Sequence, residues 1–112
     1  MNFHVITLFP EIIEAYAHAS IIGRAIKKKL ISVKAHQLRD FSRRKWKQVD
    51  DRPYAGGPGM VLEADSLVRA IEKVRGRRKA KIIITSPSGK TLTNDYARTL
   101  AFTTLVVFEL AL

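Results

Sequence analysis

Short apolar runs alternate with helical patterns along the chain, and this alternation restricts the folds open to it more than any other feature. Strands are expected at four places: Phe3–Leu8, Ile31–His36, Ala80–Thr85 and Leu105–Phe108. Helical patterns cover the intervals 11–19, 21–29, 64–76 and 93–101. Strict alternation of the two element types favours an α/β fold with an open, mostly parallel sheet, flanking helices and right-handed crossovers. At 112 residues, one domain over residues 1–112 is expected.

The residues between these elements predict where several helices begin and end. Gly76 is expected to close the third helix, and Thr93 to cap the fourth. The first helical stretch is expected to break around Ser20 and Gly23. The strand beginning at Ala80 lacks alternation, which is typical of a strand covered on both faces. Residues 38–60 form a long loop region, and loops of this length are often functional.

The turn that follows Thr85 is a candidate ligand site, because ligands of parallel sheets bind outside the carboxyl ends of the strands. Its sequence, 86-SPSGKT-91, ends like a phosphate-binding loop. However, Ile84 stands where that motif needs its first glycine, and Pro87 removes an amide donor, so nucleotide hydrolysis is disfavoured. Two interpretations remain: backbone contacts to a nucleoside, or a simple connection between strand and helix.

The segment 50-DDRPYAGGPGM-60 combines two carboxylates, an arginine and an aromatic with four positions of Gly or Pro within the last six. Such a loop is either a simple connection between two elements or a surface shaped for a flat or polar ligand. The adjacent Asp50 and Asp51 would serve a metal-dependent nuclease only with further carboxylates, and Glu63 and Asp65 are speculative partners.

Positive charge is the strongest global feature. Twenty Lys and Arg oppose ten Asp and Glu, which gives a net charge of +10. The basic residues gather in three clusters: 27–29, 43–47 and 75–81. Clustered cations on a small domain indicate a polyanionic partner, most often nucleic acid, although a solvated surface is the alternative. Trp46, inside the second cluster, could stack on a base or belong to the core.

Other chemistries find little support in the sequence. The chain has no cysteine, which rules out disulfides and thiolate catalysis and fits a cytoplasmic protein. His4, His18 and His36 lie in separate elements without metal-ligand spacing, so surface or hydrogen-bonded histidines are expected, and no metal. Ser86 has no evident base for nucleophilic catalysis. No apolar run reaches the roughly 18 residues of a membrane span, and no membrane partner is expected.

Five segments together resemble the bacterial tRNA (guanine-N1) methyltransferases. They are 4-HVITLFPEII-13, 20-SIIGRA-25, 38-LRDF-41, 49-VDDRPYAGGPGM-60 and 86-SPSGK-90, in the order and spacing of that family's amino-terminal part. The resemblance implies a trefoil-knotted (SPOUT-type) α/β enzyme that uses S-adenosylmethionine. It also implies methylation at N1 of the guanosine on the 3′ side of the tRNA anticodon, by a homodimer.

The resemblance also assigns roles to residues. The loop around Asp50 would shape the pocket of the target guanine, with Asp50 as a hydrogen-bond acceptor. The cofactor would contact Thr85, Ser86, Pro87 and Gly89. The residues expected to bind tRNA are Arg24, Arg43, Arg44, Lys45, Arg52, Tyr54, Gly56, Gly57 and Gly59.

The sequence departs from the family at two places. Ala55 replaces a further glycine, which restricts the loop, and after Phe108 the chain reads Glu109-Leu110-Ala111-Leu112 where the family continues into a glycine-rich segment and the knot. The chain is therefore expected to be an amino-terminal portion without the knot or the family's general base, and inactive by itself. It would offer the cofactor one wall, the turn at Thr85–Gly89. The alternative is a basic RNA-binding module without catalysis.

Overall fold

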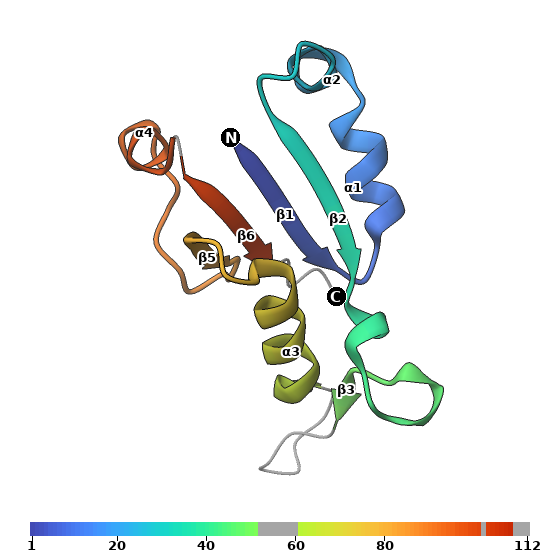
Figure 1. The fold of residues 1–112 in the computed structure, drawn as a ribbon. Helices are drawn as coiled ribbons and strands as arrows, with labels where there is room; N and C mark the ends of the chain where they lie inside the picture. The colour runs from blue at the N-terminus through green and yellow to red at the C-terminus, as the bar shows by residue number, and fades with distance from the viewer. Residues whose placement is uncertain (52–60, 102, 109–112) are drawn as a thin grey trace.

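The fold is a parallel four-stranded sheet with helices on both faces, as Figure 1 shows. The structure is a computed structural model that describes residues 1–51, 61–101 and 103–108. In chain order, the elements are β1 (Asn2–Thr7), α1 (Pro10–Ala17), α2 (Ser20–Lys27), β2 (Ser32–Gln37), the 3₁₀ turns η1 (Leu38–Phe41) and η2 (Lys45–Lys47), β3 (Asp50–Asp51), β4 (Val61–Leu62), α3 (Ala64–Arg75), β5 (Ala80–Ile84), α4 (Asn94–Leu100) and β6 (Thr104–Phe108).

The strand order of the sheet is β2-β1-β6-β5, so the amino-terminal strand is central. Val5 pairs with Ala35 on one side and with Val107 on the other, and Ile83 pairs with Val107. All three pairings are parallel, which confirms the α/β class and the parallel sheet that the alternation of elements predicts. A separate two-stranded ribbon, β3 with β4, is antiparallel.

The hydrophobic core lies between α3 and one face of the sheet. Ile6 of β1 and Ala70 of α3 are both 0 % exposed, and they share a buried cluster with Leu38, Val49 and Val74. Burying a side chain such as Ile6 contributes about 1.5–3 kcal/mol. Because Leu38 and Val49 belong to this cluster, both ends of the intervening loop are tied to the core.

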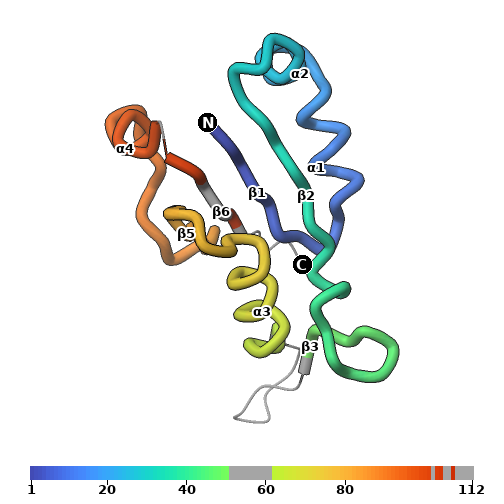
Figure 2. Tube along the Cα trace, in the orientation of Figure 1, coloured from blue at the N-terminus to red at the C-terminus, as the bar shows by residue number. Residues whose placement is uncertain are grey.

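Helix α4 packs on the opposite face of the sheet from α3. Phe3 and Ile6 are three positions apart in β1, so their side chains point to opposite faces. Ile6 packs in the α3 core, whereas Phe3 lines a groove together with Tyr96 and Leu100 of α4. In the view of Figure 2, α4 lies to the left of the strands and α1 lies to the right, beside β2.

The break between the first two helices lies at His18 and Ala19, so the prediction that places it around Ser20 and Gly23 is wrong at Gly23. Gly23 is buried inside α2. A Cβ built there would lie 2.6 Å from the backbone oxygen of His18, so only glycine allows α2 to pack this closely against the end of α1.

The two predicted helix boundaries are confirmed. Gly76 ends α3 with a φ of +59° and donates its N–H to the carbonyl of Glu72. The Thr93 hydroxyl accepts a hydrogen bond from the Tyr96 N–H at 3.1 Å, which caps α4.

The prediction that the strand from Ala80 is covered on both faces is wrong in this chain. Ile82 is 39 % exposed and Ile84 is 51 % exposed. The reason is that β5 lies at the edge of the sheet, where the described chain covers it incompletely. The region 38–60, expected as a loop, contains η1, η2 and β3 in its described part. None of the helices described has the length and apolar character that a membrane span requires.

Candidate functional site

A groove of about 670 Å³ lies between α4, the end of β5 and the start of β1. Thr85, Ser86 and Gly89 of the predicted ligand turn line it, and Pro87 does not. The remaining lining is mostly apolar and comes from the sheet and α4: Met1, Phe3, Ile83, Ile84, Lys90, Leu92, Tyr96, Ala97, Leu100, Ala101 and Val107. The turn therefore forms one side of a groove whose other sides come from the sheet and from α4.

The turn is held by its own hydrogen bonds. The Gly89 N–H donates to the Ser86 carbonyl at 3.1 Å, and the Ser88 N–H donates to the Ser86 hydroxyl at 3.3 Å. A Cβ at Gly89 would come within 3.3 Å of the Ser86 oxygen, so glycine suits the tightest point of the turn. These bonds fix a short polar rim beside an apolar groove.

This groove suits a ligand with a flat apolar part and a polar edge. Its volume falls within the range of small-molecule sites, and its lining is apolar with a few polar groups at one end. Its walls are also open, since Leu92 is 69 % exposed and Ile84 is 51 % exposed. A ligand bound here would remain partly in water.

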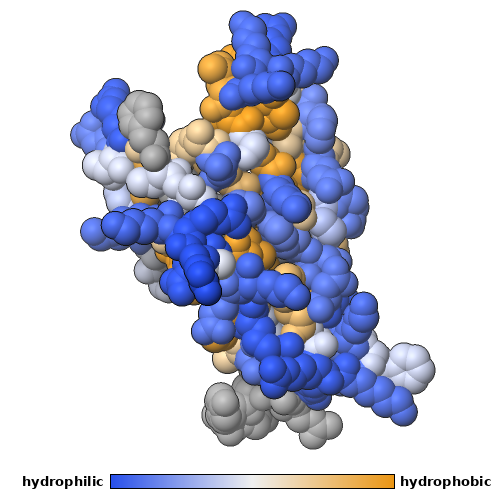
Figure 3. All heavy atoms as spheres, in the orientation of Figure 1, coloured by the Kyte–Doolittle hydropathy of each residue, from blue (hydrophilic) through white to orange (hydrophobic). Residues whose placement is uncertain are grey.

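The second basic cluster lies in a loop from Ser42 to Asp50 at the carboxyl edge of the sheet, beyond β2. The Arg44 guanidinium donates from Nη1 to the Asp50 carbonyl at 2.9 Å, and the Lys47 N–H donates to the Arg44 carbonyl at 3.1 Å. The Ser42 hydroxyl donates to the carbonyl of Gln48. We call this stretch, residues 42–50, the basic loop. Figure 3 shows hydrophilic side chains covering much of this lower end of the molecule.

The three basic clusters do not form one surface. Residues 27–29 end α2 and precede β2, and residues 75–79 precede β5, so both lie at the amino edge of the parallel sheet. The basic loop follows β2 and lies at the carboxyl edge. Arg24, on α2, lies at the opposite end of the molecule from the basic loop with Arg43, Arg44 and Lys45, as Figure 1 shows.

The remaining predicted tRNA-binding positions are Arg52, Tyr54, Gly56, Gly57 and Gly59, and they fall outside the described residues. Asp50 is described: it is half-buried in β3, where its backbone pairs with Leu62. The structure therefore places Asp50 at one end of the basic loop.

The carboxylates suggested for a metal site have other partners. Asp65 forms an ion pair with Arg69 at 3.0 Å, and Glu63 accepts a hydrogen bond from the Ser66 hydroxyl at 3.3 Å. Within residues 1–51, 61–101 and 103–108, no three His, Asp or Glu side chains gather as metal ligands would. The geometry gives the nuclease alternative no support.

His4 and His36, which lie in separate elements, come together on neighbouring strands, and burial lowers the pKa of both imidazoles, with smaller contributions from nearby cations.

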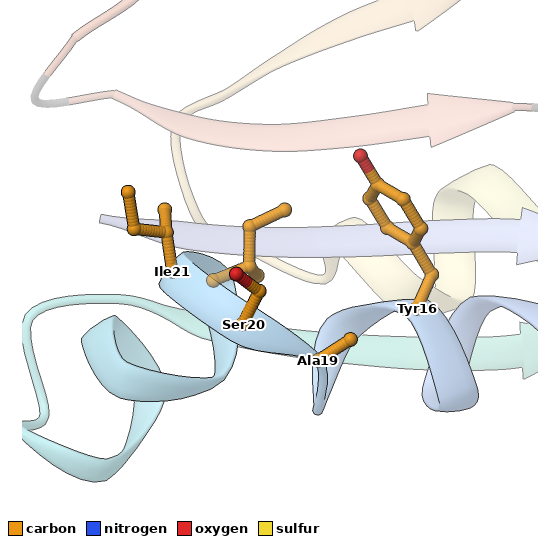
Figure 4. A pocket seen from close by; sticks show the side chains of 5 residues that line it. Tyr16, Ala19, Ser20 and Ile21 are labelled. Carbon is orange, nitrogen blue, oxygen red and sulfur yellow. The ribbon is translucent and has the colours of Figure 1, made fainter.

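A second, shallow hollow of about 230 Å³ lies at the junction of α1 and α2. In Figure 4, Tyr16 rises from α1, and Ser20 and Ile21 from α2; none of them is a predicted site residue.

The sequence alone did not predict that residues of α4 and β1 line the groove. The signal available was the spacing of Tyr96 and Leu100, which puts both on one face of a capped helix. That face could have been assigned to a ligand groove only with the position of α4 over the sheet.

A parallel sheet with helices on both faces, a groove lined by the turn after β5 and a basic loop after β2 places the chain in the class of α/β proteins. The comparisons with known proteins narrow this class. The model of the family "tRNA (Guanine-1)-methyltransferase TrmD" matches residues 1–111, and the chain belongs to this family.

Two curated relatives illustrate the match. The tRNA (guanine-N(1)-)-methyltransferase of Clostridium novyi is 43 % identical over 101 residues, which cover 90 % of this chain and 42 % of the relative. The enzyme of the same name from Mycoplasma capricolum is 46 % identical over 99 residues, covering 88 % of this chain and 41 % of the relative. The chain thus spans less than half the length of these relatives.

A solved structure shares the fold. The crystal structure of tRNA (m1G37) methyltransferase from Aquifex aeolicus matches with a TM-score of 0.87 and 34 % identity, over 96 % of this chain and 50 % of that chain. The family resemblance expected from the sequence is confirmed.

Proposed function

We propose that this chain is part of an S-adenosylmethionine-dependent enzyme that methylates N1 of the guanosine on the 3′ side of a tRNA anticodon. The observation that carries the proposal is the family match over residues 1–111, together with a groove at the turn where the family resemblance puts the cofactor. The basic loop at the same edge of the sheet adds a surface for the RNA backbone.

The groove fits the adenosine part of the cofactor. Apolar side chains such as Ile83 and Leu100 suit the faces of a purine, while the backbone groups of Ser86 and Gly89 offer polar contacts at the rim. When bound, S-adenosylmethionine would supply an electrophilic methyl group. Thr85, Ser86 and Gly89 would hold it, and Pro87 would shape the turn without entering the groove.

Asp50 would orient the target base. Guanine presents N–H donors at N1 and N2, and a carboxylate is an acceptor only, so the two are complementary. The N1 proton must leave as the methyl group arrives. The resemblance places the base that removes it beyond Phe108.

The proposed partners are tRNA and a second subunit. The homodimer follows from the family resemblance, and exposed apolar side chains on the first two helices are compatible with a protein contact. Ile12 is 60 % exposed, Tyr16 70 % and Ile21 74 %. Sedimentation of the protein with and without Ile21→Ser would measure this contact.

The function is tested with a chimera that joins residues 1–108 to the remaining half of the Aquifex aeolicus relative. We expect label from methyl-labelled S-adenosylmethionine to enter an unmodified tRNA transcript at one guanine. Reverse transcription should stop there, because a methyl group on N1 blocks base pairing. A folded chimera that transfers no methyl group, or transfers it to another atom, would contradict the proposal.

The second candidate is an RNA-binding module without catalysis, which the exposed Trp46 and the cations around it in the basic loop favour. Under both candidates we expect the 112-residue chain to bind tRNA and to transfer no methyl group, so the chimera is what separates them. If the chimera is also inactive while the chain binds tRNA, the module is the better account.

A further inference from the structure

The tryptophan of the basic loop is displayed to solvent. Trp46 is the only tryptophan in the chain, and it is 81 % exposed. Tryptophan is usually largely buried, because its ring removes a large apolar area from water. From the sequence, Trp46 could belong to the core or lie on the surface, and the structure places it on the surface.

The backbone holds Trp46 in an unusual conformation. Its φ is +63° and its ψ is +17°, and the next residue, Lys47, also has a positive φ of +52°. Bulky L-residues rarely adopt this left-handed region, so two in succession require support from their surroundings. Strained backbone of this kind is concentrated at functional sites.

That support comes from the hydrogen bonds across the basic loop. Arg44 is central: its carbonyl accepts from the Lys47 N–H at 3.1 Å, its side chain donates to the Asp50 carbonyl at 2.9 Å, and its N–H donates to the Ser42 hydroxyl at 3.2 Å. The loop is thus closed on itself around the residue it exposes. Figure 1 shows this segment, in green, standing out from the body beside β3.

The charge around Trp46 favours a polyanion over a protein as its partner. Arg43, Arg44, Lys45 and Lys47 flank Trp46 in the sequence, and the Lys45 ammonium lies 5.5 Å from the centroid of its ring. A nearby carboxylate, Asp40, makes an exposed contact with Lys47 at 3.7 Å. A protein covering Trp46 would have to desolvate these cations, whereas RNA phosphates would neutralise them.

We propose that Trp46 stacks on an unpaired RNA base while Arg43, Lys45 and Lys47 contact the adjacent phosphates. This inference rests on the proposed function in taking RNA as the partner. The ligand class is single-stranded RNA, because a base inside a duplex already has neighbours on both faces, whereas a splayed base offers one to an aromatic ring.

The single tryptophan makes the test direct, since its fluorescence reports Trp46 alone. The 112-residue chain is titrated with an oligouridylate of about ten nucleotides, which is within the usual site size. Parallel titrations use an abasic strand of the same length and an RNA duplex. We expect saturable quenching by the oligouridylate and none by the abasic strand or the duplex at equal occupancy, measured by anisotropy of labelled strands.

Variants separate stacking from charge. Trp46→Ala should weaken oligouridylate binding by about 5- to 150-fold, the range for loss of one stacked base. Trp46→Phe should recover most of the affinity. Phe9→Ala, which truncates another exposed aromatic outside the basic loop and outside the proposed subunit contact, should leave affinity unchanged. Far-ultraviolet circular dichroism confirms that each variant is folded.

Three results would overturn the inference. If wild-type chain binds RNA and folded Trp46→Ala binds equally well, stacking is refuted while the proposed function stands. If the chain binds neither tRNA nor the oligouridylate, the proposed RNA-binding role of the chain fails, and stacking with it. If Trp46→Ala dissociates an oligomer in sedimentation without changing RNA affinity, Trp46 is a protein contact.

Discussion

His4 Nδ1 lies 3.1 Å from His36 Nε2, across the two neighbouring strands β1 and β2. On its other side, His4 Nε2 lies 3.2 Å from Nη1 of Arg78. A guanidinium can only donate, so His4 Nε2 must accept and its proton must be on Nδ1. That N–H donates to His36 Nε2, which leaves the His36 proton on Nδ1. Arg78 thereby sets the tautomer of both imidazoles, in their neutral forms.

This arrangement makes stability depend on pH. Burial lowers the pKa of His4 and of His36 below the ordinary value of 6.5, and Arg78 and Lys34 lower both further; His4 also lowers that of His36. Below about pH 6.5 the unfolded chain therefore binds protons that the folded chain does not, and the free energy of unfolding falls as the pH falls. Above that pH the contribution is complete and constant.

Urea denaturation between pH 8 and pH 5 measures this effect. The expected midpoint is level at the upper end and declines below about pH 6.5. His36→Gln should flatten the decline, while His18→Gln, which leaves the pair intact, should keep it. An equal effect of both substitutions would contradict the account.

The effect of Gly23→Ala on stability tests the packing of α2 against the end of α1, because the close packing predicts a loss of stability where an exposed helix would gain it. In an exposed helix interior, Gly→Ala stabilises by up to about 1 kcal/mol. At this position the added Cβ would meet the His18 carbonyl, whose oxygen is 2.6 Å and whose carbon is 2.8 Å away. We expect Gly23→Ala to destabilise the fold by about 1–3 kcal/mol in chemical denaturation, since backbone must move. A stabilised variant would show that α2 does not pack this closely against the end of α1.

Asp50 is expected to act on the RNA substrate and not on the cofactor. In the chimera, Asp50→Asn should lower kcat/KM for tRNA by about 10- to 100-fold, because an acceptor becomes partly a donor. The affinity for S-adenosylmethionine should not change. An equal loss of cofactor affinity would make Asp50 a structural residue.

The openness of the groove leads to a prediction on cofactor binding. S-adenosylmethionine needs a site that buries most of its surface, and Leu92 and Ile84 leave this groove open. Calorimetry of the 112-residue chain at up to about 1 mM ligand should detect no binding, which corresponds to less than about 4 kcal/mol. Micromolar binding would mean that the described walls already suffice.

The fold was largely predictable because periodicity and caps carry local information. The strand runs, Gly76 and Thr93 all mark boundaries that the structure reproduces. The exposure of Ile82 and Ile84 was not predictable, because it depends on β5 lying at an edge of the sheet. The residues of a single strand do not determine the order of the strands.

The candidate site was predictable only in pieces. The turn at Ser86 could be placed from the rule on strand carboxyl ends, but its opposite wall, including Tyr96, depends on how α4 packs. The pairing of His4 with His36 depends on the parallel register of β1 and β2. The separation of the basic clusters to two edges likewise depends on the direction of the strands.

The central claim is that the basic loop at the carboxyl edge of the sheet binds tRNA, and one comparison tests it most directly. The affinity of the 112-residue chain for tRNA is measured against salt concentration for the wild type and two variants, each lacking three positive charges. One replaces Arg43, Lys45 and Lys47 by Ala; the other replaces Lys27, Lys28 and Lys29, at the opposite edge. At roughly 0.9 per phosphate contact, the first should flatten the log–log slope by about two to three, and the second by less than one. Equal losses in the two variants, or binding that does not depend on salt, would contradict the claim.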